Sequence, residues 1–143
     1  MLSTALVGAA CGCGNSVNAC QNVAAGTGTP NSPNILDLGL LSSADTGDPR
    51  EFIFTLDFQD ADGDLALGQY EVFASGGKDA QRNDLIDVFR QSALSFDARH
   101  GQLIIPLTFS SIANGARVGV AMALIDHARN RSSCYGIELA FKY

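Results

Sequence analysis

Three aspartates, Asp60, Asp62 and Asp64, stand at alternate positions in one short segment, with Gly63 between the last two. Carboxylate oxygens are ligands that Ca²⁺ prefers in proteins, and a glycine lets the backbone turn so that several of them converge on one ion. Counted from Asp60, Glu71 falls at the twelfth position, where a calcium loop of the EF-hand type has a bidentate glutamate. The sequence therefore indicates a candidate calcium site formed by these three aspartates and Glu71.

The same segment departs from an EF-hand in one decisive position. Its sixth residue is Leu65, where the EF-hand loop needs glycine, and the residues before Asp60 alternate like a strand instead of a helix. We therefore reject an EF-hand and leave two interpretations open. The segment is either a looser calcium-binding turn or a solvated turn in which the aspartates only cap the backbone, and the second use is the commoner one.

The other side chains that could take part in catalysis do not form a recognisable catalytic site. His100 and His127 are isolated, with no cysteine or second histidine at metal-ligand spacing. Ser132, His127 and Asp126 could be combined into a triad on paper, but near neighbours on one turn do not point at one another as a triad requires. We expect a protein without enzymatic activity, and a small envelope hydrolase is the weakest alternative.

Two cysteines bracket almost the whole chain, Cys20 near the start and Cys134 near the end. A disulfide between them would close a very long loop, which stabilises the folded state by roughly 4 to 5 kcal/mol in the chain-entropy model. Such a bond persists only in an oxidising compartment. The pair therefore predicts a disulfide and export from the cytoplasm.

The first residues look like an export signal. Residues 2–10 form a short run of small apolar residues that ends at Cys11, as a secretory signal ends at its cleavage site, and the run is too short to span a bilayer. A flexible tail or a buried strand is the alternative interpretation. A small-residue run that leads into cysteine resembles the lipobox of bacterial lipoproteins, which implies a lipid anchor on Cys11 or Cys13. The resemblance implies a signal segment at residues 1–12 and a location at the membrane, in the periplasm or on the cell surface.

A segment rich in Gly, Thr, Ser, Asn and Pro separates these cysteines from the periodic part of the chain. We interpret residues 13–33 as a flexible tether, although an ordinary loop has the same composition. Beyond it, residues 34–143 contain short apolar runs separated by turn signals. With 46% hydrophobic residues in 143, the chain can bury one core, so residues 34–143 are expected to form a single domain.

The clearest strand covers residues 51–59, where large apolar side chains alternate with mostly polar ones. Its apolar face consists of Phe52, Phe54, Leu56 and Phe58. Further strands are expected at residues 35–41, 69–74, 103–109, 116–125 and 136–143. Pro106 confines its strand to an edge or a bulge, since proline cannot donate to a ladder. The almost continuous apolar run at 116–125 is typical of a strand at the centre of a sheet, and residues 83–96 fit either a short helix or two strand pieces.

About seven short strands without intervening long helices indicate an all-β, antiparallel sandwich. Two stretches, residues 54–65 and 120–132, resemble the immunoglobulin-like β-sandwich domains of bacterial surface proteins, a group that includes cadherin-like and fibronectin-type modules. In the second stretch Arg129 stands where these domains have a glycine. The resemblance implies the fold, whereas the anchor-like start, the tether and the lack of a recognisable catalytic site together predict a non-catalytic interaction or structural module on the cell envelope, with a protein or glycan partner. The formal charge of −6 argues against nucleic acid as a partner.

Overall fold

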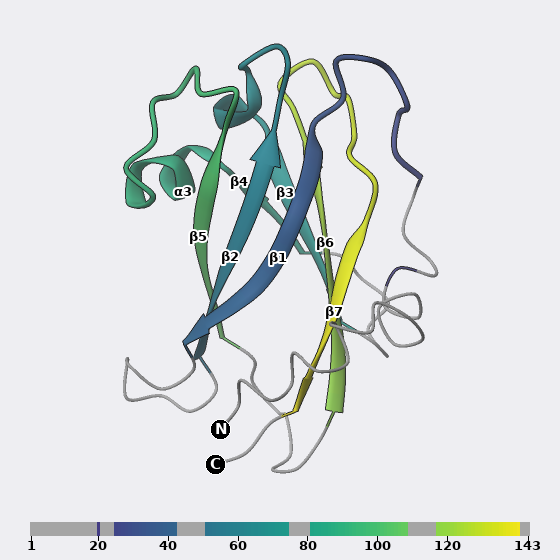
Figure 1. Ribbon diagram of the computed structural model, residues 1–143, viewed down its shortest axis with the longest axis vertical. Helices are drawn as coiled ribbons and strands as arrows, with labels where there is room; N and C mark the ends of the chain where they lie inside the picture. Colours follow the sequence, from purple (N-terminus) through teal and green to yellow (C-terminus); the bar gives the residue numbers. More distant parts are fainter. Residues whose placement is uncertain (1–19, 21–24, 43–50, 75–80, 109–116, 141–143) are drawn as a thin grey trace.

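The computed structural model describes Cys20 and residues 25–42, 51–74, 81–108 and 117–140. Within these residues the chain forms two antiparallel sheets that pack face to face (Figure 1). One sheet has the order β1-β2-β5 and the other the order β4-β3-β6-β7. The strands are β1 (Asn34–Ser42), β2 (Glu51–Gln59), β3 (Gln69–Ala74), β4 (Gln81–Asp84), β5 (His100–Thr108), β6 (Arg117–Ile125) and β7 (Tyr135–Ala140). The predicted all-β sandwich is confirmed.

Strand β2 supplies the centre of the core, because its alternating pattern places every second side chain between the sheets. Phe52, Phe54, Leu56 and Phe58 are all fully buried, and the residues between them are only half-buried. Phe54 pairs with Leu40 of β1 on one side and with Ile105 of β5 on the other. The strand with the strongest sequence signal is thus the middle strand of its sheet.

For two strands the sequence also predicted a position within the sheet, and both strands are found there. Strand β5, which contains Pro106, lies at the edge of its sheet, where the missing N–H of proline breaks no ladder on the open side. Strand β6 lies between β3 and β7, and its residues 119–124 are all buried. A continuous apolar run therefore belongs here to a central strand, as expected.

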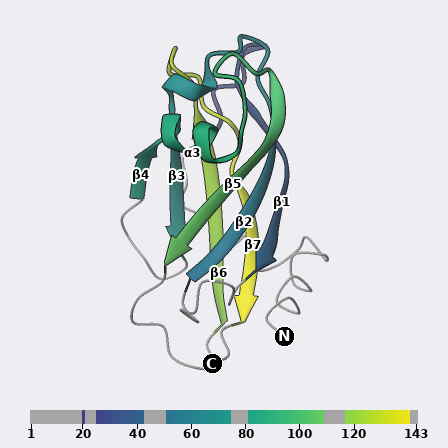
Figure 2. The same cartoon turned by 90° about the vertical axis from the view of Figure 1, so that its left-hand side faces the viewer.

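The segment left open between helix and strand contains both. Strand β4 comes first, and the short helix α3 (Ile86–Gln91) follows it directly. The helix contacts β5 and the 3-10 turn η2 (Leu65–Leu67), and it covers the upper part of the side shown in Figure 2. Its Phe89 is fully buried, with its ring 5.6 Å from that of Phe58. Strand β4 has four exposed polar residues and hence no apolar alternation from which it could be predicted.

The predicted disulfide is present, joining Cys20 to Cys134 with the two Cα atoms 5.8 Å apart. After it, the chain lies along the domain, because the Thr27 amide donates to the Arg131 carbonyl at 2.8 Å and the Arg131 amide donates to the Thr27 hydroxyl at 2.6 Å. The described part of the segment interpreted as a tether, Cys20 and residues 25–33, is thus fastened to the sandwich at Cys20 and at Thr27.

The remainder of the predicted N-terminal organisation lies outside the described residues. This applies to the signal segment at residues 1–12, to both anchor cysteines, Cys11 and Cys13, and to the rest of the predicted tether at residues 13–19 and 21–24. In the part of the chain that the structure describes, no helix is long and apolar enough to cross a membrane.

Candidate metal centre

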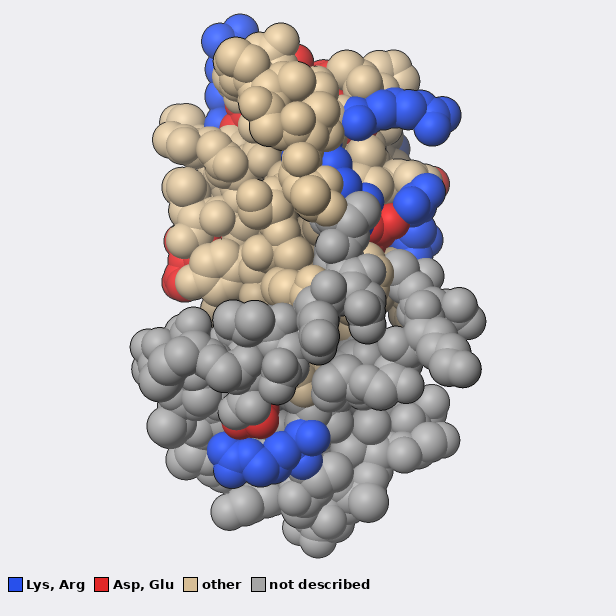
Figure 3. Space-filling view, turned by 90° about the vertical axis from the view of Figure 1, so that its right-hand side faces the viewer, with Lys and Arg blue, Asp and Glu red and all other residues tan. Residues whose placement is uncertain are grey.

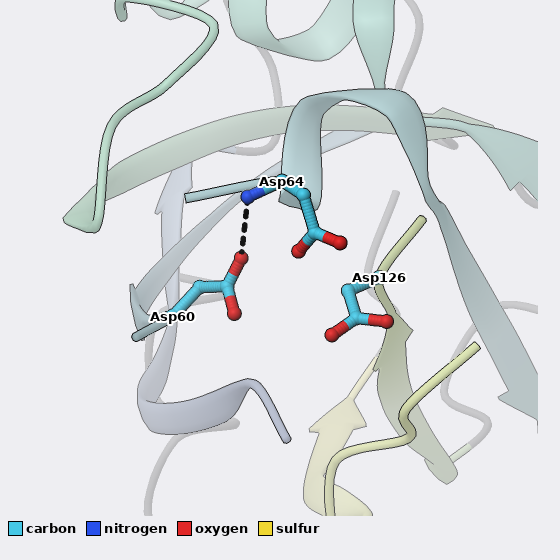
Figure 4. Close-up of side chains that lie close together, drawn as sticks. All are labelled: Asp60, Asp64 and Asp126. Carbon is cyan, nitrogen blue, oxygen red and sulfur yellow. Dashed lines mark hydrogen bonds between the residues drawn. The ribbon is translucent and has the colours of Figure 1, made fainter. Parts of the chain in front are cut away.

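Three aspartates from two distant parts of the chain meet at the upper end of the sandwich in Figure 1, where β2 and β6 both end. Asp60 directly follows β2, Asp64 directly precedes η2, and Asp126 directly follows β6. Each residue offers a carboxylate oxygen, and these oxygens lie within 4.8 Å of one another. Figure 4 shows the three carboxylates turned toward one common space. The group therefore connects the first sheet, through β2, with the second sheet, through β6.

The turn that carries Asp60 and Asp64 is held by the backbone. The Asp64 amide donates to Oδ2 of Asp60 at 3.0 Å, and the Gly63 amide donates to the Asp60 carbonyl at 3.2 Å. Gly63 has a φ of +68°, a conformation that side chains disfavour, and a Cβ there would lie 2.8 Å from the carbonyl oxygen of Asp97. The Asp60 amide in turn donates to the carbonyl of Arg99 at 2.7 Å. Glycine is thus required by both conformation and space.

The turn that carries Asp126 is held by Asn130. Its backbone amide donates to Oδ1 of Asp126 at 2.7 Å, and its side-chain amide donates to Oδ2 at 3.1 Å. Arg129 has a φ of +71°, a left-handed conformation that favours glycine over other residues. The Ala128 amide donates to Oδ2 of Asp64 at 3.2 Å, so the two acidic turns are also bonded to each other.

The carboxylates of this group are largely buried, and not all of their oxygens accept a hydrogen bond within the described part of the chain. Asp60 is 1% exposed and Asp126 is 2% exposed. Oδ1 of Asp60 and Oδ1 of Asp64 are both buried, and neither accepts a hydrogen bond from any described residue. A buried carboxylate oxygen without a partner is costly, so such atoms point to a missing ligand. An ion that prefers oxygen ligands would satisfy both.

The pKa of Asp60 shows that, among the described residues, the group also lacks a positive charge to balance its carboxylates. The pKa of Asp60 is raised from its ordinary value of 3.8 to about 6, chiefly by burial, and also by the side-chain hydrogen bond with Asp64 and by the charges of Asp64 and Asp126. The hydrogen bond from the Asp64 amide acts in the opposite sense but does not compensate. Near neutral pH the group therefore carries several negative charges in a buried place.

The other two predicted ligands lie elsewhere. Asp62 is exposed and does not belong to the group. Glu71 is buried on β3, where its carboxylate forms ion pairs with Arg82 and Arg131. Burial alone would raise the pKa of Glu71, but the hydrogen bonds from the two arginines outweigh it and lower the pKa. The structure thus groups the first and third aspartates of the motif with Asp126, which the spacing within the motif did not indicate.

The residues considered for a catalytic triad do not form one in the structure. The Ser132 hydroxyl accepts a hydrogen bond from the Leu124 amide at 2.8 Å and donates one to the Ser133 carbonyl at 2.9 Å. His127 and His100 are both exposed. Ser132 therefore fastens the chain after the acidic turn to the end of β6.

Comparisons with known proteins identify the fold. No protein-family model matches the chain, and no curated protein matches it. Among solved structures, the chain is similar to the crystal structure of a Niemann-Pick type C2 protein from the Japanese carpenter ant, with a TM-score of 0.54 and 11% sequence identity. The match covers 82% of this chain and 97% of the ant protein. The fold is an immunoglobulin-like β-sandwich. At this identity the likeness extends to the fold alone, and it does not support the narrower cadherin-like or fibronectin-type grouping.

Proposed function

We propose that this protein is a non-catalytic, exported immunoglobulin-like domain whose upper end is closed by one Ca²⁺ bound to Asp60, Asp64 and Asp126. The observation that carries the proposal is the pair of buried carboxylate oxygens, Oδ1 of Asp60 and Oδ1 of Asp64, that accept no hydrogen bond from any described residue. Both belong to the group of three carboxylates that are close enough to share one ion.

The composition of the group favours calcium over other metals. It consists of aspartates only, and carboxylate oxygens suit a hard cation, whereas zinc and copper sites favour histidine or cysteine. Calcium takes six to eight oxygen ligands in flexible geometry, so water and backbone carbonyls would have to complete its coordination. Magnesium is less suitable because it demands a near-ideal octahedron and dehydrates reluctantly.

The ion would act as a clasp between the sheets. Asp60 follows β2 of the first sheet and Asp126 follows β6 of the second, so one ion bound to both ties the two sheets together at this end. An ion that binds only the folded chain stabilises it in proportion to the logarithm of its concentration. A domain of this kind is stable in a calcium-containing exterior.

The clasp is tested by thermal unfolding with calcium and with a chelator, in the unaltered chain and in two variants. We expect about 1 mM calcium to raise the Tm of the unaltered chain. Asp126→Asn removes a ligand and should abolish this shift, whereas Asp62→Asn changes an exposed carboxylate of the same acidic segment and should preserve it. Each variant is compared with itself, so a change in its basal stability does not affect the result. A shift that survives in Asp126→Asn, or no shift in the unaltered chain, contradicts the proposal.

We extend the proposal to the location of the protein. The Cys20–Cys134 disulfide supports export, since such bonds persist in oxidising compartments. The small-residue run at residues 2–10 supports a lipid anchor on Cys11 or Cys13, with the domain displayed in the periplasm or on the cell surface toward a protein or glycan partner.

The anchor is tested by the intact mass of the protein expressed in a bacterial host. The proposal expects loss of the residues before Cys11 or Cys13 together with added acyl chains. An unprocessed chain would contradict the anchor without affecting the calcium clasp.

A further inference from the structure

A groove of about 640 Å³ opens beside the metal centre. Three arginines line it, Arg82, Arg129 and Arg131, together with Asp84, Asp126 and His127. Asp126 is also a member of the metal centre, so the groove and the candidate ion site share one side chain. On the face shown in Figure 3, basic side chains lie at several places in the upper half, the end of the molecule at which β2 ends.

The gathering of arginines is unusual for this chain. It has nine basic residues and a formal charge of −6, and three of the nine line this one groove. Asp84, Asp126 and the buried Glu71 balance the three arginines in the metal-free protein. A calcium ion bound at Asp126 would neutralise part of that negative charge. Because the two positive charges of the ion face the three aspartates of its site, the groove becomes less negative when the ion site is filled.

Glu71 holds two of the arginines in place. Its carboxylate is 3% exposed and forms ion pairs with Arg82 and Arg131, whose side chains are 54% and 14% exposed. A guanidinium has five N–H donors, and the bonds of Arg82 to Glu71 use its Nε and one terminal nitrogen. Because Glu71 fixes the Arg82 guanidinium, this group is arranged in advance to receive an oxyanion at low entropic cost. Arg129, exposed on the turn after β6, adds a third positive charge.

We propose that this groove binds an acidic sugar of the uronic acid type, with its carboxylate held by Arg82 and Arg129. The volume lies within the range of roughly 300 to 1,000 Å³ that is usual for small-ligand sites. Thr27, Gln69 and Asp84 also line the groove and can exchange hydrogen bonds with sugar hydroxyls. Only the expected strengthening of binding by calcium rests on the function proposed above.

The test is a titration of the full chain with trigalacturonate, in the presence of calcium and in the presence of a chelator. Maltotriose serves as the neutral sugar, and acetate as a carboxylate without a sugar. Arg129→Gln should weaken trigalacturonate binding roughly tenfold, the effect of one lost charge-assisted hydrogen bond. Arg90→Gln removes an exposed arginine of α3 that pairs with Asp87 away from the groove, and it should leave binding unchanged. The two variants also control for calcium that trigalacturonate binds in free solution.

The outcomes separate this inference from the proposed function. Both the acidic-sugar site and the calcium clasp are supported if trigalacturonate binds more weakly to Arg129→Gln and in chelator, and if maltotriose does not bind. Calcium binding without trigalacturonate binding overturns the groove and leaves the clasp intact. Trigalacturonate binding that is equal with calcium and with chelator retains the groove but overturns its coupling to the ion site. Equal affinity for acetate and trigalacturonate, or equal affinity in Arg129→Gln and Arg90→Gln, overturns the acidic-sugar site.

Discussion

At the scale of single residues, Asp60 carries the largest electrostatic conflict in the described part of the molecule. It is 1% exposed, it lies beside two other carboxylates, and one of its oxygens accepts no hydrogen bond from the described residues. Burial and the neighbouring carboxylates raise the pKa of Asp60 to about 6, so below that pH the metal-free protein relieves this conflict by holding a proton on Asp60. Calcium would relieve it by replacing that proton.

The raised pKa predicts how stability changes with pH in the presence of a chelator. Because the folded-state pKa of Asp60 exceeds its ordinary value of 3.8, the folded chain binds more protons than the unfolded chain. The contribution of Asp60 to the free energy of unfolding therefore falls as the pH rises from about 4 to about 6, by at most about 3 kcal/mol, and then levels off. Glu71 acts oppositely, since its pKa is lowered and its contribution is lost as the pH falls below 4.5.

Chemical unfolding across this pH range checks the prediction. The comparison is with Asp60→Asn, which cannot titrate at this position. The difference in unfolding free energy between the unaltered chain and the variant should change with pH in the direction given above. A difference that stays constant from about pH 4 to about pH 7 would show that Asp60 has an ordinary pKa.

The site residues differ in how far the sequence alone could predict them. Asp60 and Asp64 belong to one acidic turn, and their types and spacing indicated an ion site directly. Asp126 could not be found in this way, because it reaches the group only when the ends of β2 and β6 meet in the folded sandwich. Glu71 was predicted from the spacing of an EF-hand loop, but β3 carries it to two arginines instead.

At the scale of elements, sequence patterns predicted those strands that bury at least one of their two faces. Strand β2 alternates strictly, and its predicted and observed bounds agree. Strand β4 was not predicted, because all four of its residues are exposed and polar and it is formed only by pairing with β3. An edge strand without a buried face leaves no apolar period in the sequence.

The acidic turn after β2 gives a prediction at this scale. Gly63→Ala should destabilise the chain by roughly 1 to 3 kcal/mol and weaken calcium binding, because alanine meets both the unfavourable φ and the Asp97 carbonyl at 2.8 Å. Gly28→Ala is the matched control, since Gly28 has a φ of +75° and no atom within 4 Å of the added Cβ. Chemical unfolding measures both. If the two variants lose equal stability, crowding at Gly63 contributes nothing.

The disulfide gives a second prediction for the elements that it joins. Replacing Cys20 and Cys134 together by serine should lower the unfolding free energy by roughly 2 to 5 kcal/mol, because the unfolded chain is then less constrained. Replacing Cys11 and Cys13 together by serine should leave stability unchanged, since we assign the anchor to one of these two and the disulfide to neither. Unfolding of both variants under non-reducing conditions provides the measurement. Equal stability of the two would argue against a structural role for the Cys20–Cys134 bond.

At the scale of the whole molecule, the two sheets share one core and are joined at separate places on the surface. The Cys20–Cys134 disulfide fastens the N-terminal segment beside the start of β7, and Thr27 continues that attachment through Arg131. Asp60, Asp64 and Asp126 meet where β2 and β6 end. In this account the sandwich is held by its core, by an oxidised bond and by one ion, all of which suit an exterior compartment.

The most direct test of the central claim is calorimetric titration of metal-free protein with calcium, in two buffers of different ionisation enthalpy. Near pH 6 about half of the Asp60 side chains hold a proton that calcium must displace. The account predicts one calcium ion per chain, with roughly half a proton released near pH 6 and almost none at about pH 8. No calcium binding, or binding without proton release near pH 6, would contradict a calcium site built around Asp60.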